Sequence, residues 1–337
     1  MVKQEPLGPG IEFDLIRRFL AGGAPPGPAV ELGAGDDCAV VAAPRIALSV
    51  DLSLEGVHFR REWLAPEEIG YRAAMAALSD LAAMAAAPIG VLAALGVPSG
   101  DLPETAAAIM AGVRRAVEEC GGALLGGDLV RSLGGVVLDI VALGSAEGVV
   151  RRAGAVPGDE LWVTGELGGA AAAVRAWLAG EEPSSAAREA FARPRARIAE
   201  ARWLAEAGVL HAMLDLSDGL AGDLQHLAAA SGVALVVEEA AVPVHGAAAA
   251  TGVGLELALS GGEDYELCFA APAGVVEGMI EGFAAEFGVR LHRVGSVVAG
   301  GGEVGGVRLE VGQVGFLRRD GRVELLQSSG FQHFRGS

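Results

Sequence analysis

Two adjacent aspartates, Asp36 and Asp37, follow a turn with two glycines and stand between apolar segments that are typical of β-strands. Gly33 and Gly35 permit backbone conformations with positive φ and the close approach of another group. Two carboxylates that are ~4 Å apart repel each other by about 4 kcal/mol at an effective dielectric constant near 20. The pair therefore predicts either a solvated polar turn, where Asp is common, or a site where a cation relieves the repulsion.

Composition limits what the chain can bind and where it works. The 337 residues suffice for two domains with a core each, and the net charge of −18 disfavours a nucleic-acid or anionic-membrane partner. No apolar run is long enough to predict a membrane span, and residues 1–10 lack the apolar core of a signal peptide. The three cysteines form no C-x-x-C pair and are odd in number, which favours the reducing cytoplasm over a disulfide framework.

Lys3 is the only lysine in the chain; every other basic residue is an arginine. P-loop nucleotide sites, protein-kinase sites and pyridoxal-phosphate sites each need a lysine at a defined place. Lys3 stands in none of those sequence contexts. A protein of this composition that handles phosphate groups must neutralise them with metal ions or arginines.

Short apolar segments alternate with alanine-rich helical segments along the chain. In the first half we expect strands over 30–32, 38–42, 46–50, 89–97, 123–125 and 136–143, and helices over 66–87 and 102–120. In the second half the expected strands, over 160–163, 233–237 and 267–270 and at the apolar start of the stretch 212–220, again alternate with helices. This alternation predicts an α/β (α+β) layer structure, with domains over 1–148 and 149–337.

Further aspartates interrupt or follow these apolar segments. Asp51 and Asp128 are expected where strands end, Asp80 lies in a helix of small apolar residues, and Asp215 interrupts a strand shortly before Asp218. Scattered carboxylates without a Cys/His set at zinc spacing suit a hard cation bound through oxygen, and Mg²⁺ is the expected ion. Asp80 can equally mark the solvent-exposed side of its helix.

Two loops of the second half allow alternative interpretations. Residues 164–169 enter a helix, so their backbone amides form a natural anion site at its N-terminus, although an ordinary glycine-rich connection has the same pattern. Ser217 or Asp218 can hold an ion or simply cap the helix that follows. No Ser-His-Asp or Cys-His arrangement with a recognisable nucleophile elbow is present, so covalent catalysis has little support.

The ordered motifs of the chain resemble those of thiamine-monophosphate kinase, in the aminoimidazole-ribonucleotide-synthetase-like superfamily. They are Gly-Ala-Gly-Asp-Asp-Cys-Ala at 33–39, Leu-Ser-Asp-Leu-Ala-Ala-Met at 78–84, Gly-Gly-Asp at 126–128, Asp-Leu-Ser-Asp-Gly-Leu at 215–220 and Ser-Gly-Gly-Glu-Asp-Tyr-Glu-Leu at 260–267. The closing Gly-Phe-Gln-His-Phe at 330–334 and the opening segment around Glu12 and Phe13 are also similar to the family's. The resemblance runs essentially end to end, and six motifs in order at family spacing are highly specific.

The resemblance implies a two-domain synthetase-like fold. Its N-terminal domain would be a mixed sheet with helices that binds metal and ATP and pairs with the sheet of a second subunit in a homodimer, and its C-terminal domain would be α/β. The implied activity is ATP-dependent phosphorylation of thiamine monophosphate to thiamine diphosphate, assisted by several Mg²⁺ ions.

The resemblance also implies the site residues. The metal ligands are Asp37, Ser49, Val50, Asp51, Asp80, Asp128, Asp215 and Asp218. ATP contacts are Gly127, Asp128, Arg152 and Ser217, and contacts to the thiamine side are His58, Glu263 and Phe331. Val50 stands where the family commonly has Thr, so it can offer a metal only its backbone carbonyl. Because Arg151 precedes Arg152, either arginine can be the one that contacts ATP. His58 can instead be an ordinary surface residue, and Phe331 can simply pack the C-terminal tail.

The chemistry of such a reaction needs no general base. A phosphate monoester has a second pKa near 6, so the attacking oxygen of thiamine monophosphate is already ionised at neutral pH. The remaining obstacle is to bring two polyanions in line, which metal ions overcome by neutralising their oxygens. A cationic thiazolium favours an acidic and an aromatic neighbour. Two rivals stay open: a superfamily ATPase acting on a purine-pathway or related substrate, and a non-catalytic nucleotide-binding module.

Overall fold

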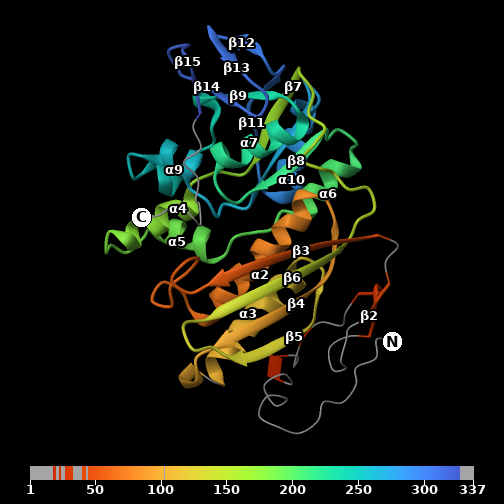
Figure 1. Ribbon diagram of the computed structural model, residues 1–337, viewed down its shortest axis with the longest axis vertical. Coiled ribbons are helices and arrows are strands. Elements are labelled where there is room, and N and C mark those ends of the chain that lie inside the picture. The colour runs from red at the N-terminus through yellow and green to blue at the C-terminus, as the bar shows by residue number, and fades with distance from the viewer. Residues whose placement is uncertain are drawn as a thin grey trace. The chain divides into compact units, whose positions relative to one another are not determined.

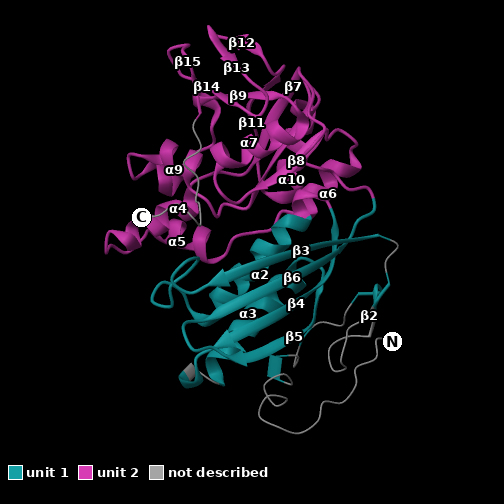
Figure 2. Cartoon of the chain, viewed as in Figure 1, with its two compact units in different colours: residues 1–81, 86–147 teal, residues 82–85, 148–337 magenta. Residues whose placement is uncertain are grey.

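The computed structural model describes residues 18–19, 23, 27–32, 40–42, 45–101 and 103–326. The chain forms two compact units (Figure 2): unit 1 comprises residues 1–81 and 86–147, and unit 2 comprises residues 82–85 and 148–337. Within the described ranges, no helix combines the length and the apolar character that crossing a membrane requires.

Unit 1 is built on a four-stranded sheet with the strand order β3-β6-β4-β5, and Figure 1 shows α2 and α3 against one of its faces. Strands β4 and β5 are parallel, whereas the pairs β3–β6 and β4–β6 are antiparallel. The elements are β1 (Val30–Leu32), β2 (Val40–Val41), β3 (Ile46–Leu54), α2 (Pro66–Ala83), β4 (Ala87–Val97), η1 (Ser99–Asp101), α3 (Glu104–Glu119), β5 (Ala123–Arg131) and β6 (Val137–Ser145).

Helices α2 and α3 cross with their backbones in contact. A Cβ atom at Gly70 of α2 would lie 1.8 Å from the carbonyl oxygen of Ile109, and one at Gly112 of α3 would lie 1.9 Å from the carbonyl oxygen of Glu67. Only glycine leaves room for such an approach. Nearby, the Tyr71 hydroxyl of α2 donates to the Glu119 carboxylate of α3 at 2.7 Å. The two glycines therefore set how closely the helical layer packs.

The two faces of the unit 1 sheet differ in character. The helix-covered face includes Ser49, whose hydroxyl donates to the carboxylate of Asp80 on α2. Because side chains alternate along a strand, the neighbours of Ser49 in β3 point to the opposite face. That face is exposed and apolar on β3, where Ile46, Leu48, Val50 and Leu52 keep 42%, 67%, 65% and 45% of their surface accessible. We call these four residues the β3 apolar stripe.

Unit 2 is built on a seven-stranded sheet with the strand order β15-β14-β9-β11-β7-β10-β8, in which only the β14–β9 pair is parallel. A separate hairpin, β12–β13, turns at Gly305 and Gly306. The elements are β7 (Asp159–Thr164), α4 (Gly169–Leu178), α5 (Ser185–Ala192), α6 (Ile198–Glu206), β8 (Ala212–Leu216), α7 (Leu220–Ser231), β9 (Ala234–Glu238), η2 (Glu239–Ala241), α8 (Gly246–Ala249), α9 (Gly254–Ser260), β10 (Glu266–Pro272), η3 (Val276–Met279), α10 (Ile280–Phe287), β11 (Leu291–Val298), β12 (Gly302–Val304), β13 (Val307–Leu309), β14 (Val314–Leu317) and β15 (Val323–Leu325).

The core of unit 2 lies between this sheet and α7. Leu220, Leu224 and Leu227 repeat at helical spacing along α7 and are fully buried in one cluster with strand residues that include Leu214 and Leu235. Burying each leucine stabilises the unit by roughly 1.5–3 kcal/mol. This packing fixes the start of α7 relative to the end of β8.

The prediction of a mixed α/β architecture is confirmed, but two strand ends differ from the prediction. Strand β3 continues to Leu54 and strand β5 to Arg131, so Asp51 and Asp128 lie inside strands and not just beyond them. In both strands the cross-strand ladder continues past the aspartate. Pairing with a neighbouring strand thus overrides the low strand preference of Asp and Gly.

The α2–α3 contact gives a stability prediction. Gly112→Ala adds a Cβ that meets backbone atoms of α2, so the helices must separate, and we expect a loss of about 1–3 kcal/mol in the free energy of unfolding. Thermal denaturation followed by circular dichroism measures it. Gly100→Ala is the matched control, because a Cβ there meets nothing within 4 Å. Equal melting temperatures for the two variants would contradict the role of Gly112.

Candidate active site

In unit 1, part of the predicted acidic set lies on the helix-covered face of the sheet. Asp80 on α2 accepts the hydroxyl of Ser49, and Asp51 lies two residues further along β3, on the same face as Ser49. Asp80 is exposed although its helix neighbours Ser79 and Leu81 are buried. The structure therefore agrees with the interpretation that Asp80 lies on the solvent-exposed side of its helix. It also shows that the Asp80 carboxylate is hydrogen-bonded to Ser49.

Asp128 lies on the other face of the same sheet. The cross-strand register aligns Leu52, Asp139, Ala94 and Asp128 in one row, and residues in register share a face. Leu52 belongs to the β3 apolar stripe, so Asp128 points away from the helices. One Asp128 oxygen accepts the backbone N–H of Leu129 at 2.9 Å.

Gly127, beside Asp128, is required by close packing in the sheet. A Cβ at this position would lie 1.9 Å from the carbonyl oxygen of Ala93 on β4. Gly127 therefore lets β5 approach β4 so closely that no side chain fits at this position. Among the described residues, no three His, Cys, Asp or Glu side chains converge closely enough to hold a metal ion. Asp36 and Asp37 lie outside the described residues.

In unit 2, three carboxylates gather where β8 passes into α7. Asp223, in the first turn of α7, is buried and accepts the backbone N–H groups of Ser217 at 3.0 Å and Asp218 at 3.1 Å. Burial, and then the negative charges of Asp215 and Asp218, raise the pKa of Asp223 to about 8. Asp223 thus shapes the turn that carries Ser217 and Asp218.

The structure does not support the helix-cap alternative for Ser217 and Asp218. The N-cap residue of α7 is Gly219, and its helix start has no side-chain cap. A Cβ at Gly219 would lie 2.9 Å from the backbone of Ser260, so this residue also brings the turn against the end of α9. The side chains of Ser217 and Asp218 are therefore not used as helix caps.

A second loop, residues 262–265, is hydrogen-bonded to this turn. The backbone N–H of Glu263 donates to the carbonyl of Ser217 at 2.8 Å, and that of Tyr265 donates to the carbonyl of Leu216 at 2.8 Å. Glu263 and Tyr265 have φ values of 75° and 52°, a conformation that costs non-glycine residues about 1–3 kcal/mol each. The Tyr265 hydroxyl donates to the Glu263 carboxylate at 2.7 Å. Backbone strain on both sides of Asp264 indicates a functional loop.

Asp264 anchors this loop to the glycine-rich segment before α4. Its carboxylate accepts the backbone N–H of Gly168 at 2.8 Å, and burial raises the pKa of Asp264 well above its usual value. The backbone N–H of Ala170 also stabilises the carboxylate. The anion site predicted at the start of α4 is therefore filled by the protein's own carboxyl group.

A buried ion pair lies next to this anchor. The guanidinium of Arg197 binds both carboxylate oxygens of Glu266, one of them at 2.8 Å, and Thr164 donates to the same carboxylate at 2.6 Å. Burial works against the charge of Arg197, but the two glutamates Glu266 and Glu200 outweigh it and raise the pKa of Arg197. Since the carboxylate and guanidinium satisfy each other, this pair holds β10 to α6 and is not available to a ligand.

Comparison with known proteins agrees with these motifs. Residues 35–146 match the N-terminal domain of the AIR synthase related proteins, and residues 156–308 match their C-terminal domain. The thiamine-monophosphate kinase of Mycobacterium tuberculosis H37Rv is 36% identical over 273 residues, covering 77% of this chain and 81% of that protein. The enzyme of Salmonella typhimurium is 33% identical, covering 96% of this chain and 98% of that protein. The chain belongs to the thiamine-monophosphate kinase family.

Solved structures of the family share the fold. The thiamine-monophosphate kinase of Stenotrophomonas maltophilia K279a superposes with a TM-score of 0.76 at 30% identity, covering 94% of this chain and 98% of that one. The protein AaThiL complexed with AMPPCP and TMP gives a TM-score of 0.72 at 28% identity, covering 95% of each chain. The hydrogenase maturation protein HypE in complex with ATP gives 0.75 at 20% identity and shows the common fold alone.

The other positions that the family motifs single out are placed as follows. His58 is partly buried, and its Nδ1 accepts the backbone N–H of Leu54 at 3.1 Å, so the ring is oriented and its Nε2 carries the proton. Arg151 and Arg152 are both exposed, and their carbonyls accept Met213 N–H and the Ser231 hydroxyl. Phe331 lies outside the described residues.

Sequence reasoning missed Asp223 and Asp264, which hold the loops of unit 2. A signal for Asp223 was present, because it lies beside Leu224 among the buried leucines of α7, where an ionisable side chain needs partners. Asp264 stands in the motif at 260–267, but the motif does not indicate its role, since its partner Gly168 is distant in sequence. The positive φ values of Glu263 and Tyr265, on either side of Asp264, are likewise seen only in the folded chain.

The raised pKa of Asp223 gives a pH prediction. In the metal-free protein Asp223 keeps its proton up to about pH 8, whereas in the unfolded chain it titrates near its ordinary pKa of 3.8. Between these two pH values the unfolded state therefore binds fewer protons than the folded state. The contribution of Asp223 to the free energy of unfolding is thus full at low pH and is lost as the pH rises toward 8. We expect the melting temperature in EDTA to fall over this range.

Asp223→Asn removes the titrating group but keeps a carbonyl oxygen that accepts the same two amides. We expect this variant to lose part of the pH dependence of the melting temperature, measured in EDTA from about pH 5 to about pH 9. Glu277→Gln, an exposed change in unit 2, should keep the dependence of the unaltered protein. An undiminished slope in Asp223→Asn would refute the assignment.

Proposed function

We propose that this protein transfers the γ-phosphoryl group of ATP to thiamine monophosphate and forms thiamine diphosphate. Membership of the thiamine-monophosphate kinase family and the complex of AaThiL with AMPPCP and TMP support this activity. The structural observation that best supports this activity is a hydrogen bond in unit 2 between the loop 262–265 and the turn at residues 217–218. The backbone of Glu263, a thiamine-side position, is bonded at 2.8 Å to Ser217, an ATP-side position.

We further propose that several Mg²⁺ ions assist the transfer. Asp215 and Asp218 lie near Asp223 and raise its pKa, and the described residues form no ready-made three-ligand site, but the donors are all oxygens, which suits a hard cation. The ligands we propose are Asp37, Ser49, the Val50 carbonyl, Asp51, Asp80, Asp128, Asp215 and Asp218. When bound, Mg²⁺ would neutralise phosphate oxygens of ATP and thiamine monophosphate.

In the proposed phosphoryl transfer, the protein's side chains bind and orient the two substrates. The phosphate of thiamine monophosphate is ionised at neutral pH, so no side chain must remove a proton. Arg152 and Ser217 would contact ATP, together with the backbone around Gly127. His58, Glu263 and Phe331 would contact the thiamine side. There the Glu263 carboxylate, which accepts the Tyr265 hydroxyl, would face the thiazolium cation.

We also propose that the protein forms a homodimer through the face of the unit 1 sheet that bears the β3 apolar stripe. The β3 apolar stripe is an exposed apolar surface on an edge strand, which proteins normally cover. On the same face Asp139 has a buried carboxylate oxygen without a hydrogen-bond partner among the described residues. A two-fold pairing would cover the stripe with its own copy and bring Asp128, on the same face, to the interface.

We place the protein in the cytoplasm. The chain has three cysteines, an odd number, and the two that the structure describes, Cys120 and Cys268, are free thiols. Free buried thiols persist where the environment is reducing.

Incubation with ATP, Mg²⁺ and thiamine monophosphate tests the activity. We expect stoichiometric ADP and thiamine diphosphate, separated by liquid chromatography, and no product in EDTA. Asp128→Asn should lower turnover by about 100-fold or more without lowering the melting temperature, the scale of losing one preorganised electrostatic contact. Glu147→Gln, which removes one exposed charge of unit 1, should leave turnover unchanged. Absence of thiamine diphosphate with the unaltered protein would disprove the proposed activity.

The dimer has its own test. Leu48→Glu puts a charge in the centre of the β3 apolar stripe, so we expect a monomer by size-exclusion chromatography with light scattering where the unaltered protein is a dimer. Leu133→Glu is the control, because Leu133 is 91% exposed and lies outside the regular strands. A Leu48→Glu protein that stays dimeric would show that the two copies meet elsewhere.

A further inference from the structure

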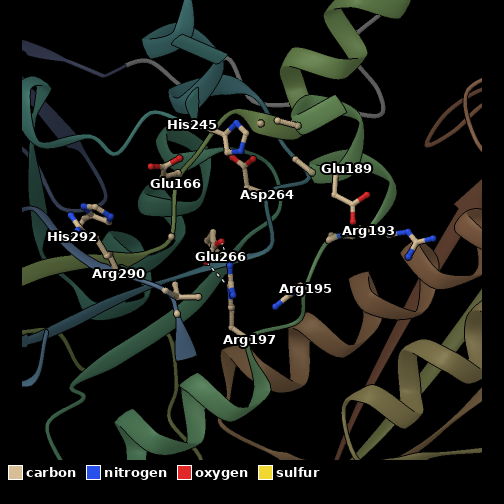
Figure 3. A pocket seen from close by; sticks show the side chains of 17 residues that line it. Glu166, Glu189, Arg193, Arg195, Arg197, His245, Asp264, Glu266, Arg290 and His292 are labelled. Atoms are coloured by element: carbon tan, nitrogen blue, oxygen red, sulfur yellow. Dashed lines mark hydrogen bonds and ion pairs between the residues drawn. The ribbon is translucent and has the colours of Figure 1, made fainter. Parts of the chain in front are cut away.

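Unit 2 contains a cavity of about 630 Å³ that the proposed reaction does not use (Figure 3). It lies among the glycine-rich segment before α4, the turn between α5 and α6, and the segment between α10 and β11. None of the proposed metal, ATP or thiamine contacts lines it. Small-molecule sites in proteins usually measure about 300–1,000 Å³, so the cavity can enclose a metabolite.

Three arginines of the cavity, Arg193, Arg195 and Arg290, form no ion pair with any described residue. This is unexpected in a chain with 43 acidic and 25 basic residues. Arg197 on the same wall shows the contrast, since Glu266 and Glu200 neutralise it. Figure 3 shows Arg195 and Arg290 entering from different sides of the cavity. Arginines that line a cavity without an ion-pair partner favour an anionic ligand.

The acidic residues of the walls are in part bound by the protein itself. Glu266 is paired with Arg197, and the Asp264 carboxyl group accepts the backbone N–H of Gly168 at 2.8 Å. Burial raises the pKa of Asp264 and lowers the pKa of His292, so burial disfavours the charged form of both groups. The three arginines without an ion pair are thus the groups of the cavity that a ligand can bind.

A hydrogen-bond donor on the wall also suits an oxyanion. The Nδ1 atom of His245 accepts the N–H of Ala247 at 3.2 Å, so its Nε2 carries a proton. Gly169 lets the His245 ring pack against the start of α4, because a Cβ at this position would come within 3.0 Å of the ring and of Ala190. The glycine thus helps to hold the His245 ring at the wall of the cavity.

We propose that this cavity binds a small metabolite through an oxyanion group, phosphate or carboxylate, held by Arg195 and Arg290. Arginine binds either group with two parallel hydrogen bonds. The bound molecule would also lie against Asp264, the residue between Glu263 and Tyr265. Occupancy therefore reaches the loop that the proposed reaction uses, although the site itself is separate from it.

Isothermal titration calorimetry of the full chain in EDTA tests the site, with sodium diphosphate and sodium citrate as separate probes. EDTA removes metal-dependent binding at the proposed active site. We expect saturable binding of at least one probe, and which one binds distinguishes a phosphate ligand from a carboxylate ligand. Arg195→Gln and Arg290→Gln should each weaken it by at least about tenfold. Arg308→Gln, an exposed arginine of unit 2 outside the cavity, should not.

Another variant, Glu189→Gln, tests the site without removing an arginine, because it should strengthen binding and not weaken it. Glu189→Gln removes a competing carboxylate from the same wall, so it should tighten binding of the probe by about twofold or more. No binding of either probe, equal affinity in the arginine variants, or no gain in Glu189→Gln would overturn the proposal. Loss of binding in Asp215→Asn would also overturn it, because that residue lies outside the cavity. None of these outcomes depends on whether thiamine monophosphate is phosphorylated.

Discussion

Two backbone hydrogen bonds hold the acidic turn of unit 2 to the loop that carries Glu263. The amides of Glu263 and Tyr265 donate to the carbonyls of Ser217 and Leu216, both at 2.8 Å, and both donors have left-handed backbone. Strain of this kind persists only where surrounding contacts impose it. Here Asp264 supplies one such contact at the start of α4. The position of Glu263 thus depends on interactions between segments far apart in the chain.

Repulsion between carboxylates is the second constraint. Asp215 and Asp218 raise the pKa of the buried Asp223, and Asp223 in turn binds the backbone of the turn that carries Asp218. Such an arrangement lowers the stability of the metal-free protein at high pH, because the buried group must then lose its proton. In the proposed function this cost is accepted because the Mg²⁺ ions would need negatively charged ligands.

In unit 1 the same sheet has two different faces. The face with Ser49 and Asp51 meets the helices, while the face with the β3 apolar stripe also carries Asp128. Aspartates of one predicted metal set therefore point to opposite sides of the sheet in a single chain. The proposed dimer gives the exposed face a partner and accounts for the apolar character of β3, which is typical of a surface that becomes buried.

The sequence by itself determined the class of fold, the family and most candidate residues. Alternating apolar and alanine-rich segments predicted the mixed sheets and their helices, and ordered motifs such as residues 215–220 identified the family, because periodicity and spacing are local properties of the chain. Only the tertiary structure decided that Asp51 and Asp128 lie inside strands on opposite faces, and that Asp223 and Asp264 hold the loops. Strand pairing, burial and contacts between distant segments set these features, and none of them is encoded in a short stretch of residues.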